Sequence, residues 1–222
     1  MLGQAMVPLL LTLKVATFAT LLALLTGVLF AFVIARYRVP GREVLDAVCT
    51  LPMVMPPTVL GYYLIVVIGR RGWIGEWLWD HLGVSLMFTW QGAVFASAIV
   101  AFPLVYKGAR AAFEGVDRQL ENAARTLGVA PSGVFLRITL PLAWRGILAG
   151  GMLAFARAMG EFGATLMVAG NIPGKTQTLS LAVYDAVQAG QDDLANFLVA
   201  VTSIVCIAIL VGSGRLFKKA WA

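Results

Sequence analysis

"LENAARTLGVAPSGVFLRITLP", residues 120–141, is a polar stretch punctuated by glycine and proline in a chain that is otherwise mostly apolar. The apolar residues of its first half fall at i, i+3, i+4 and i+7, which is one face of a helix: Leu120, Ala123, Ala124 and Leu127. The two alanines are small, so another backbone could approach this face closely. The stretch therefore predicts a short amphipathic helix against which another element can pack.

A second short helix is expected directly after the first. Gly128 is placed to end the first helix in a left-handed conformation, and Pro131 suits the first turn of the next one. The apolar residues of that helix share one side: Val134, Phe135 and Ile138. Pro141 is expected to stop it, because proline lacks the amide hydrogen that a helix interior needs. This pair, with an apolar knob pointing outward, suits either a helix lying on a bilayer or a docking element for another subunit.

The composition of the whole chain indicates a membrane protein. Of its 222 residues, 60% are hydrophobic and 13% are charged, whereas soluble domains are about 45–50% apolar and about 25% charged. The length suits one compact helix bundle, so we expect a single domain over residues 1–222. The net charge of +6 does not indicate nucleic-acid binding, because the basic residues gather between apolar runs, as orientation signals do.

Five apolar runs are candidates for transmembrane helices, which need about 20 residues each. Four of them are continuous, near residues 8–35, 86–106, 147–169 and 197–211, and the fifth, near 44–69, contains Pro52, Pro56 and Pro57. The expected fold is therefore all-α: a polytopic membrane bundle of about five helices with an amphipathic insert. Whether residues 171–196 hold a sixth helix or a re-entrant segment stays open.

The basic residues predict the orientation of the chain in the membrane. They cluster in three segments that five alternating spans place on one side, namely residues 36–43, residues 107–145 and the C-terminus. The positive-inside rule makes that side cytoplasmic, with the N-terminus outside and the C-terminus inside. Arg70 and Arg71 oppose this rule, and we interpret their tryptophan-rich segment as an interfacial helix.

The insert resembles the EAA loop of permease subunits in ATP-binding cassette (ABC) importers of type I. That motif reads Glu-Ala-Ala, three residues, Gly, nine residues, Ile-x-Leu-Pro, and all of its spacings occur here. One position differs from the motif. Asn122 occupies the place of the motif's glutamate, and the chain's own glutamate, Glu121, lies one residue earlier. The resemblance implies a coupling helix within a loop of about residues 114–144, which docks on an ATPase subunit. The implied coupling residues are Glu121, Asn122, Ala123, Ala124, Gly128, Phe135, Ile138, Leu140 and Pro141.

The resemblance extends over nearly the whole chain. The stretches "LPMVMPPTVLGYYLIV" and "FARAMGEFGATLMVAGNIPGKT" are similar to those of oxyanion permeases, particularly permeases for molybdate, with tungstate possible. "GEFGA…GNIPGKT" is shared with sulfate and thiosulfate permeases, so these stay an alternative. The resemblance implies an inner-membrane homodimer that works with two ATPase subunits and an external oxyanion-binding protein.

Two features inside the apolar runs are candidates for the transport pathway or its gate. Arg157 and Glu161 lie four residues apart, and charges at membrane depth need a partner or water. They form either a structural ion pair or part of a route for an anion. Pro56 and Pro57 lie where the 44–69 run is interrupted, and the break is either a simple kink or a wall or hinge of a channel.

The sequence lacks the motifs that several other functions require. "GNIPGKT", residues 170–176, has three residues between its glycines where a P-loop has four, so ATP is expected to be bound by a partner and no cofactor by this chain. His81 is the lone histidine, which argues against a metal site and against a Ser-His or Cys-His enzyme. A passive channel is the alternative from another functional class, but a channel does not need a loop that docks on an ATPase.

Overall fold

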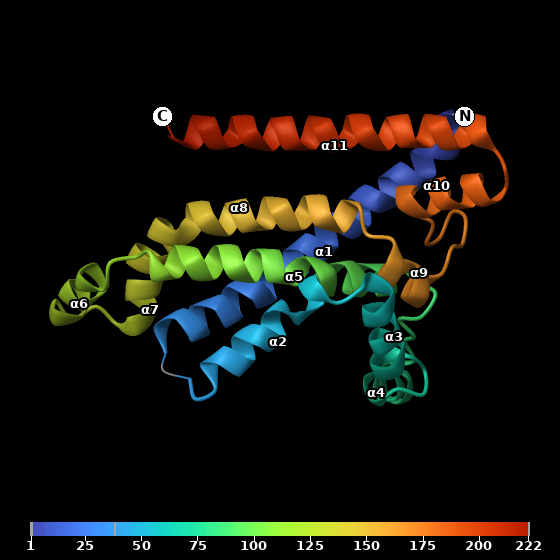
Figure 1. Ribbon diagram of the computed structural model, residues 1–222. Helices are drawn as coiled ribbons and strands as arrows, with labels where there is room; N and C mark the ends of the chain where they lie inside the picture. Colours follow the sequence, from blue (N-terminus) through green and yellow to red (C-terminus); the bar gives the residue numbers. More distant parts are fainter. Residues whose placement is uncertain (1, 38, 222) are drawn as a thin grey trace.

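The computed structural model describes the backbone of residues 2–37 and 39–221, and the side chains of residues 3–37 and 39–212. The described chain is helical, and its long helices lie side by side (Figure 1). The long helices are α1 (Leu2–Arg36), α5 (Trp90–Glu114), α8 (Leu140–Met159) and α11 (Asp192–Trp221). The shorter ones are α2 (Arg42–Val54), α3 (Pro57–Ile68), α4 (Trp73–Leu82), α6 (Arg118–Thr126), α7 (Pro131–Val134), the π-helix η1 (Phe135–Thr139), α9 (Gly163–Ala169) and α10 (Leu179–Gln188).

The centre of the bundle is formed by α1, α5 and α8, which pack through small side chains. Its buried alanines are Ala16, Ala19 and Ala23 of α1, Ala93, Ala98 and Ala101 of α5, and Ala154 and Ala158 of α8. A Cβ added to Gly108 of α5 would lie 3.0 Å from the Cα of Gly150 in α8. Without a hydrophobic drive between helices in lipid, such close backbone contact supplies the packing energy.

The predicted number of spans agrees with the structure. Within the described residues, four helices are long and apolar enough to cross a membrane, and the bent pair α2–α3 makes a fifth candidate. The axes of α2 and α3 are bent by 115° at this break. Pro56 and Pro57 lie at this corner, whereas Pro52 lies inside α2.

Two predicted boundaries are wrong. The span expected over residues 147–169 is not one helix, because α8 ends at Met159 and α9 begins only at Gly163. Pro141 does not stop the second insert helix, since α7, η1 and α8 run on as one helix from Pro131 to Met159. The wider turn of η1, in which the Leu140 amide donates to the carbonyl of Phe135, accommodates the proline that follows.

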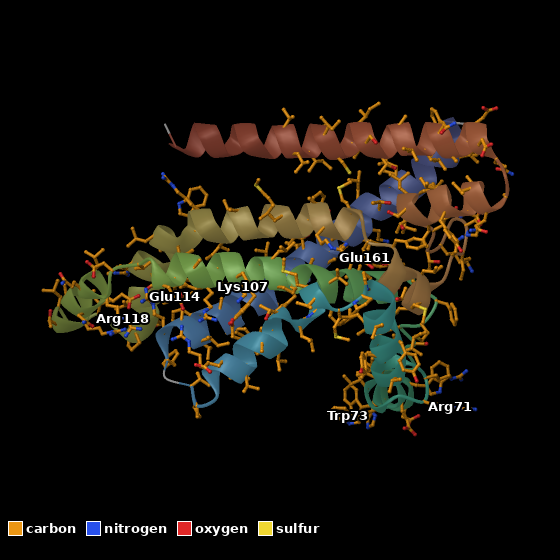
Figure 2. The ribbon with its side chains drawn as sticks, in the orientation of Figure 1. Arg71, Trp73, Lys107, Glu114, Arg118 and Glu161 are labelled. Carbon is orange, nitrogen blue, oxygen red and sulfur yellow. The ribbon has the colours of Figure 1, made fainter. Side chains whose placement is uncertain are left out.

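The two ends of the bundle carry different segments. The polar insert, with α6 and α7, lies at one end, which we call the loop end (Figure 1). At the other end, α3 and α4 turn away from the bundle, and Arg71 and Trp73 lie near their tip (Figure 2). Residues 171–196, left open by the sequence, contain the short helix α10 and the first residues of α11, and these two helices pack on each other.

Candidate functional site: the loop end and the helix breaks

The insert forms α6 as its sequence predicts, and a second helix starts at Pro131 as predicted but continues into the bundle. Asp117 caps α6 by accepting a hydrogen bond from the Gln119 amide at 2.8 Å. Gly128 follows α6 with a φ of +79°, which is the left-handed conformation expected there. Pro131 occupies the first turn of α7. Gly128 therefore sets the end of α6, and Pro131 sets the start of α7.

The insert is tied to the bundle by a buried carboxylate. Glu121 of α6 is 4% exposed, and its Oε1 lies 3.0 Å from Nη2 of Arg36 at the end of α1. The hydroxyl of Thr139 donates to the same oxygen at 2.6 Å. Charge-assisted bonds of this kind are short and strong, so Glu121 joins α1, α6 and η1 at one point.

An aromatic cluster adds a second attachment between the insert and the bundle. The ring of Phe135 lies 4.5 Å from that of Phe32 in α1 and 6.3 Å from that of Phe113 in α5. Val134 is 2% exposed. These apolar residues of the second insert helix face the bundle, so the predicted outward knob is not made by them.

The outward surface of the insert is made instead by leucines. Leu127 is 83% exposed, Leu136 60% and Leu120 49%. The candidate coupling residues divide accordingly. Asn122, Ala123, Gly128 and Pro141 are exposed, Phe135, Ile138 and Leu140 are half-buried, and Glu121 and Ala124 are buried. The strict motif position, Asn122, is thus exposed, and Glu121 is buried.

The two helix breaks lie against each other. A Cβ added to Gly163, at the start of α9, would lie 3.1 Å from the Cβ of Pro57 at the start of α3. Glu161 sits in the break before α9 and is 2% exposed. Its Oε1 accepts a hydrogen bond from the Ala164 amide at 2.8 Å, which satisfies an orphan donor at the start of α9. The structure therefore brings together the candidate pathway residues that lie about 100 positions apart.

Arg157 reaches the same break from the end of α8. Its Nη1 lies 2.9 Å from Oε2 of Glu161, and its side chain is 36% exposed against 1% for that of Glu161. Figure 2 shows Glu161 where α8 gives way to α9. The ion pair fixes the break, while the side chain of Arg157 stays partly accessible.

A further ion network near the loop end was not predicted from the sequence. Asp46 of α2 accepts a hydrogen bond from Tyr106 at 2.8 Å and pairs with Lys107 at 3.1 Å and with Arg110. Glu114 pairs with Arg110 on its own helix at 3.0 Å. Arg110 and Glu114, four residues apart, were a possible signal in α5, but nothing near Asp46 indicates its partners. The network holds α2 against α5 (Figure 2 labels Lys107 and Glu114).

These features define a class of protein. The family model for the binding-protein-dependent transport system inner membrane component matches residues 5–220, which is nearly the whole helix bundle with its insert. The chain belongs to this family, and it is an inner-membrane, multi-pass transport component.

Individual members of the family, and one solved structure, are similar to this chain over most of its length. A molybdenum transport system permease protein of Escherichia coli (strain K12) is 47% identical over 204 residues, which cover 91% of this chain and 89% of that protein. A probable sulfate transport system permease protein of Nephroselmis olivacea is 34% identical over 90% of this chain and 70% of that protein. The fold is similar to that of a chain in inward-facing structures of the MetNI methionine ABC transporter, with a TM-score of 0.76, 16% identity and coverage of 99% and 97%.

Replacing Glu121 with glutamine should loosen the insert. The change leaves Arg36 without its buried counter-charge, and breaking such a pair costs about 3 kcal/mol. We expect trypsin to cleave the insert of the purified protein roughly 100-fold faster, because local opening limits cleavage there. Gln119→Ala, on the same helix, serves as the control. Equal cleavage rates for the wild type and Glu121→Gln would show that the ion pair does not hold the insert.

Proposed function

We propose that this chain is the permease subunit of an ABC importer for molybdate, and for tungstate as a chemically similar oxyanion. Two copies form a homodimer that works with two ATPase subunits and an external oxyanion-binding protein. The 47% identity to the Escherichia coli molybdenum permease supports the substrate. The lower identity, 34%, to the sulfate permease makes sulfate or thiosulfate the second candidate.

The single observation that carries the coupling role is the two-sided construction of the insert. Its inner side is held by the Arg36–Glu121 pair and the aromatic cluster. Its outer side exposes Leu120 and Leu127 beside Ala123, one apolar stripe of a helix. An exposed apolar stripe on an otherwise polar helix suits the groove of a partner protein. The partner is the ATPase subunit, which also binds the ATP.

The insert is joined to the bundle in a way that suits transmission of movement. The helix from Pro131 to Met159 is continuous, so displacement of its insert end moves the whole of α8. The contact of Glu121 with Arg36 adds α1. ATP-driven approach of the two ATPases would then swing both helices and alternate the exposure of the pathway.

The orientation follows from the same assignment. The loop end carries the basic residues Arg36, Arg118 and Arg125, and short basic loops stay in the cytoplasm. The ATPase therefore meets the insert inside the cell, with the N-terminus outside and the C-terminus inside. Residues 171–178 between α9 and α10 then face outward, toward the binding protein.

The facing helix breaks are the proposed pathway or gate. Unpaired backbone groups within a membrane are tolerated where protein or a water-filled cavity covers them. Pro56 and Pro57 form one side, and the Arg157–Glu161 pair forms the other. Glu161 holds the geometry of the break, while the accessible part of Arg157 offers positive potential to a passing dianion.

Leu127→Glu should abolish binding of the ATPase. The substitution places a charge in the centre of the proposed apolar contact, and desolvating it without a partner is unfavourable. Co-purification of the ATPase with the tagged permease measures this loss. Leu82→Glu, which changes an equally apolar and 60% exposed leucine in α4, should leave the ATPase bound. Normal recovery of the ATPase with Leu127→Glu would contradict the docking role.

Arg157→Gln should lower molybdate uptake while the transporter still assembles. We expect a fall of about tenfold, which corresponds to about 1.4 kcal/mol of added barrier, because the dianion loses a favourable charge. Uptake into vesicles measures it, and Lys14→Gln, a change to another intramembrane cation, is the control. Unchanged uptake would remove Arg157 from the pathway.

Competition in proteoliposomes that contain all three components tests the substrate. We expect excess tungstate to suppress uptake of labelled molybdate and excess sulfate to leave it nearly unchanged. Suppression by sulfate or thiosulfate would favour the second candidate. Flux through the permease without ATP would instead indicate a passive channel.

A further inference from the structure

A small cavity lies inside the insert, between the end of α1, α6 and the helix that begins with α7. Its volume is about 190 Å³. The side chains with polar groups that line it are Arg36, Tyr37, Arg118, Glu121, Asn122, Arg125 and Thr139. Figure 2 shows Arg118 at this end of the molecule. The cavity is separate from the apolar stripe that we assign to the ATPase, and from the helix breaks.

The charges around the cavity do not balance. Three guanidinium groups line it, against the single carboxylate of Glu121. That carboxylate is engaged by Arg36 at 3.0 Å, and Arg125 lies farther from it, at 3.8 Å. Arg118 donates to the backbone carbonyl of Ala35 at 3.4 Å, which neutralises no charge. The cavity therefore keeps an excess of two positive charges.

One donor of a residue that lines the cavity is both buried and unsatisfied. The side chain of Arg36 is 9% exposed, and its Nε has no hydrogen-bond partner among the described residues. Buried donors in folded proteins nearly always have an acceptor, because leaving one unpaired costs about 1–3 kcal/mol. Arg36 uses its Nη2 for Glu121 and the Val116 carbonyl, and its Nε–H is the buried donor for which the described residues supply no acceptor.

We propose that this cavity binds a tetrahedral oxyanion of the phosphate class. An anion with one or two negative charges reduces the excess, and its oxygens can accept from guanidinium groups that approach from different directions. Arginine is the residue best suited to planar, paired contact with such oxygens. The amide of Asn122 offers another donor at the cavity wall. The source of the anion is either free phosphate or the phosphate of an anionic lipid headgroup.

The anion would fasten the insert at three places. Arg36 ends α1, Arg118 begins α6 and Arg125 lies in the last turn of α6. A ligand shared by these three groups binds the closed insert and not an opened one, so it stabilises the closed form by mass action. The inference is independent of the anion that the permease imports.

Hydrogen–deuterium exchange on the intact permease–ATPase complex tests this site. Peptides from residues 118–139 are compared in a neutral detergent with inorganic phosphate and with chloride at equal ionic strength. Nanodiscs of phosphatidylglycerol are compared with nanodiscs of phosphatidylcholine. Exchange should slow about tenfold when the anion is present at about ten times its dissociation constant. Slowing by free phosphate identifies a soluble ligand, and slowing only in phosphatidylglycerol identifies the headgroup.

Two arginine variants test whether the slowing of exchange depends on this cavity. Arg118→Gln should abolish the slowing, and it is expected to fold because this side chain is exposed and contributes one bond to the bundle. Arg71→Gln, an exposed arginine beside α4 at the opposite end, should respond like the wild type. The proposal is overturned if neither anion slows exchange, or if Arg118→Gln responds equally. Such a failure would leave the transport proposal standing, because molybdate uptake is measured separately.

Discussion

The structure depends on one buried contact, the ion pair between Glu121 of the insert and Arg36 at the end of α1. Without it, α6 would be attached to the bundle by its flanking turns, by neighbouring apolar packing and by the bond from Arg118 to the Ala35 carbonyl. With it, and with the Thr139 hydroxyl on the same oxygen, three segments that are distant in sequence meet at one carboxylate. A buried charge is favourable only when it is paired in this manner, so the contact specifies one position of the insert.

Helix breaks provide the second constraint. A carboxylate inside a membrane span is costly, yet Glu161 satisfies the first turn of α9 and balances Arg157 at the same time. Gly163 lets this break approach Pro57 closely. The molecule thus combines a continuous helix from the insert to Met159 with a corner where helices α3 and α9 meet. A continuous helix that ends at a discontinuity is suited to transmit movement into a gate.

The sequence predicts the features that local chemistry controls. Gly128 and Pro131 punctuate the insert as expected, and the apolar runs give the number of spans. The helix end predicted at Pro141 is wrong because a π-turn lets the helix continue, and no local sequence pattern indicates that turn. The Arg36–Glu121 pair joins residues 85 positions apart, and only the tertiary arrangement brings them together. The roles of the coupling and pathway residues stay predictions of the motif and of this geometry.

The central claim is that the insert moves with the ATPase subunits. Pulsed electron paramagnetic resonance measures this movement directly. The native cysteines, Cys49 and Cys206, are removed, and Thr126 of each permease copy is replaced by a cysteine that carries a spin label. The measured quantity is the distance between the two labels. The account predicts that binding of ATP shortens this distance together with the distance between the two ATPases. An unchanged distance between the inserts while the ATPases close would contradict it.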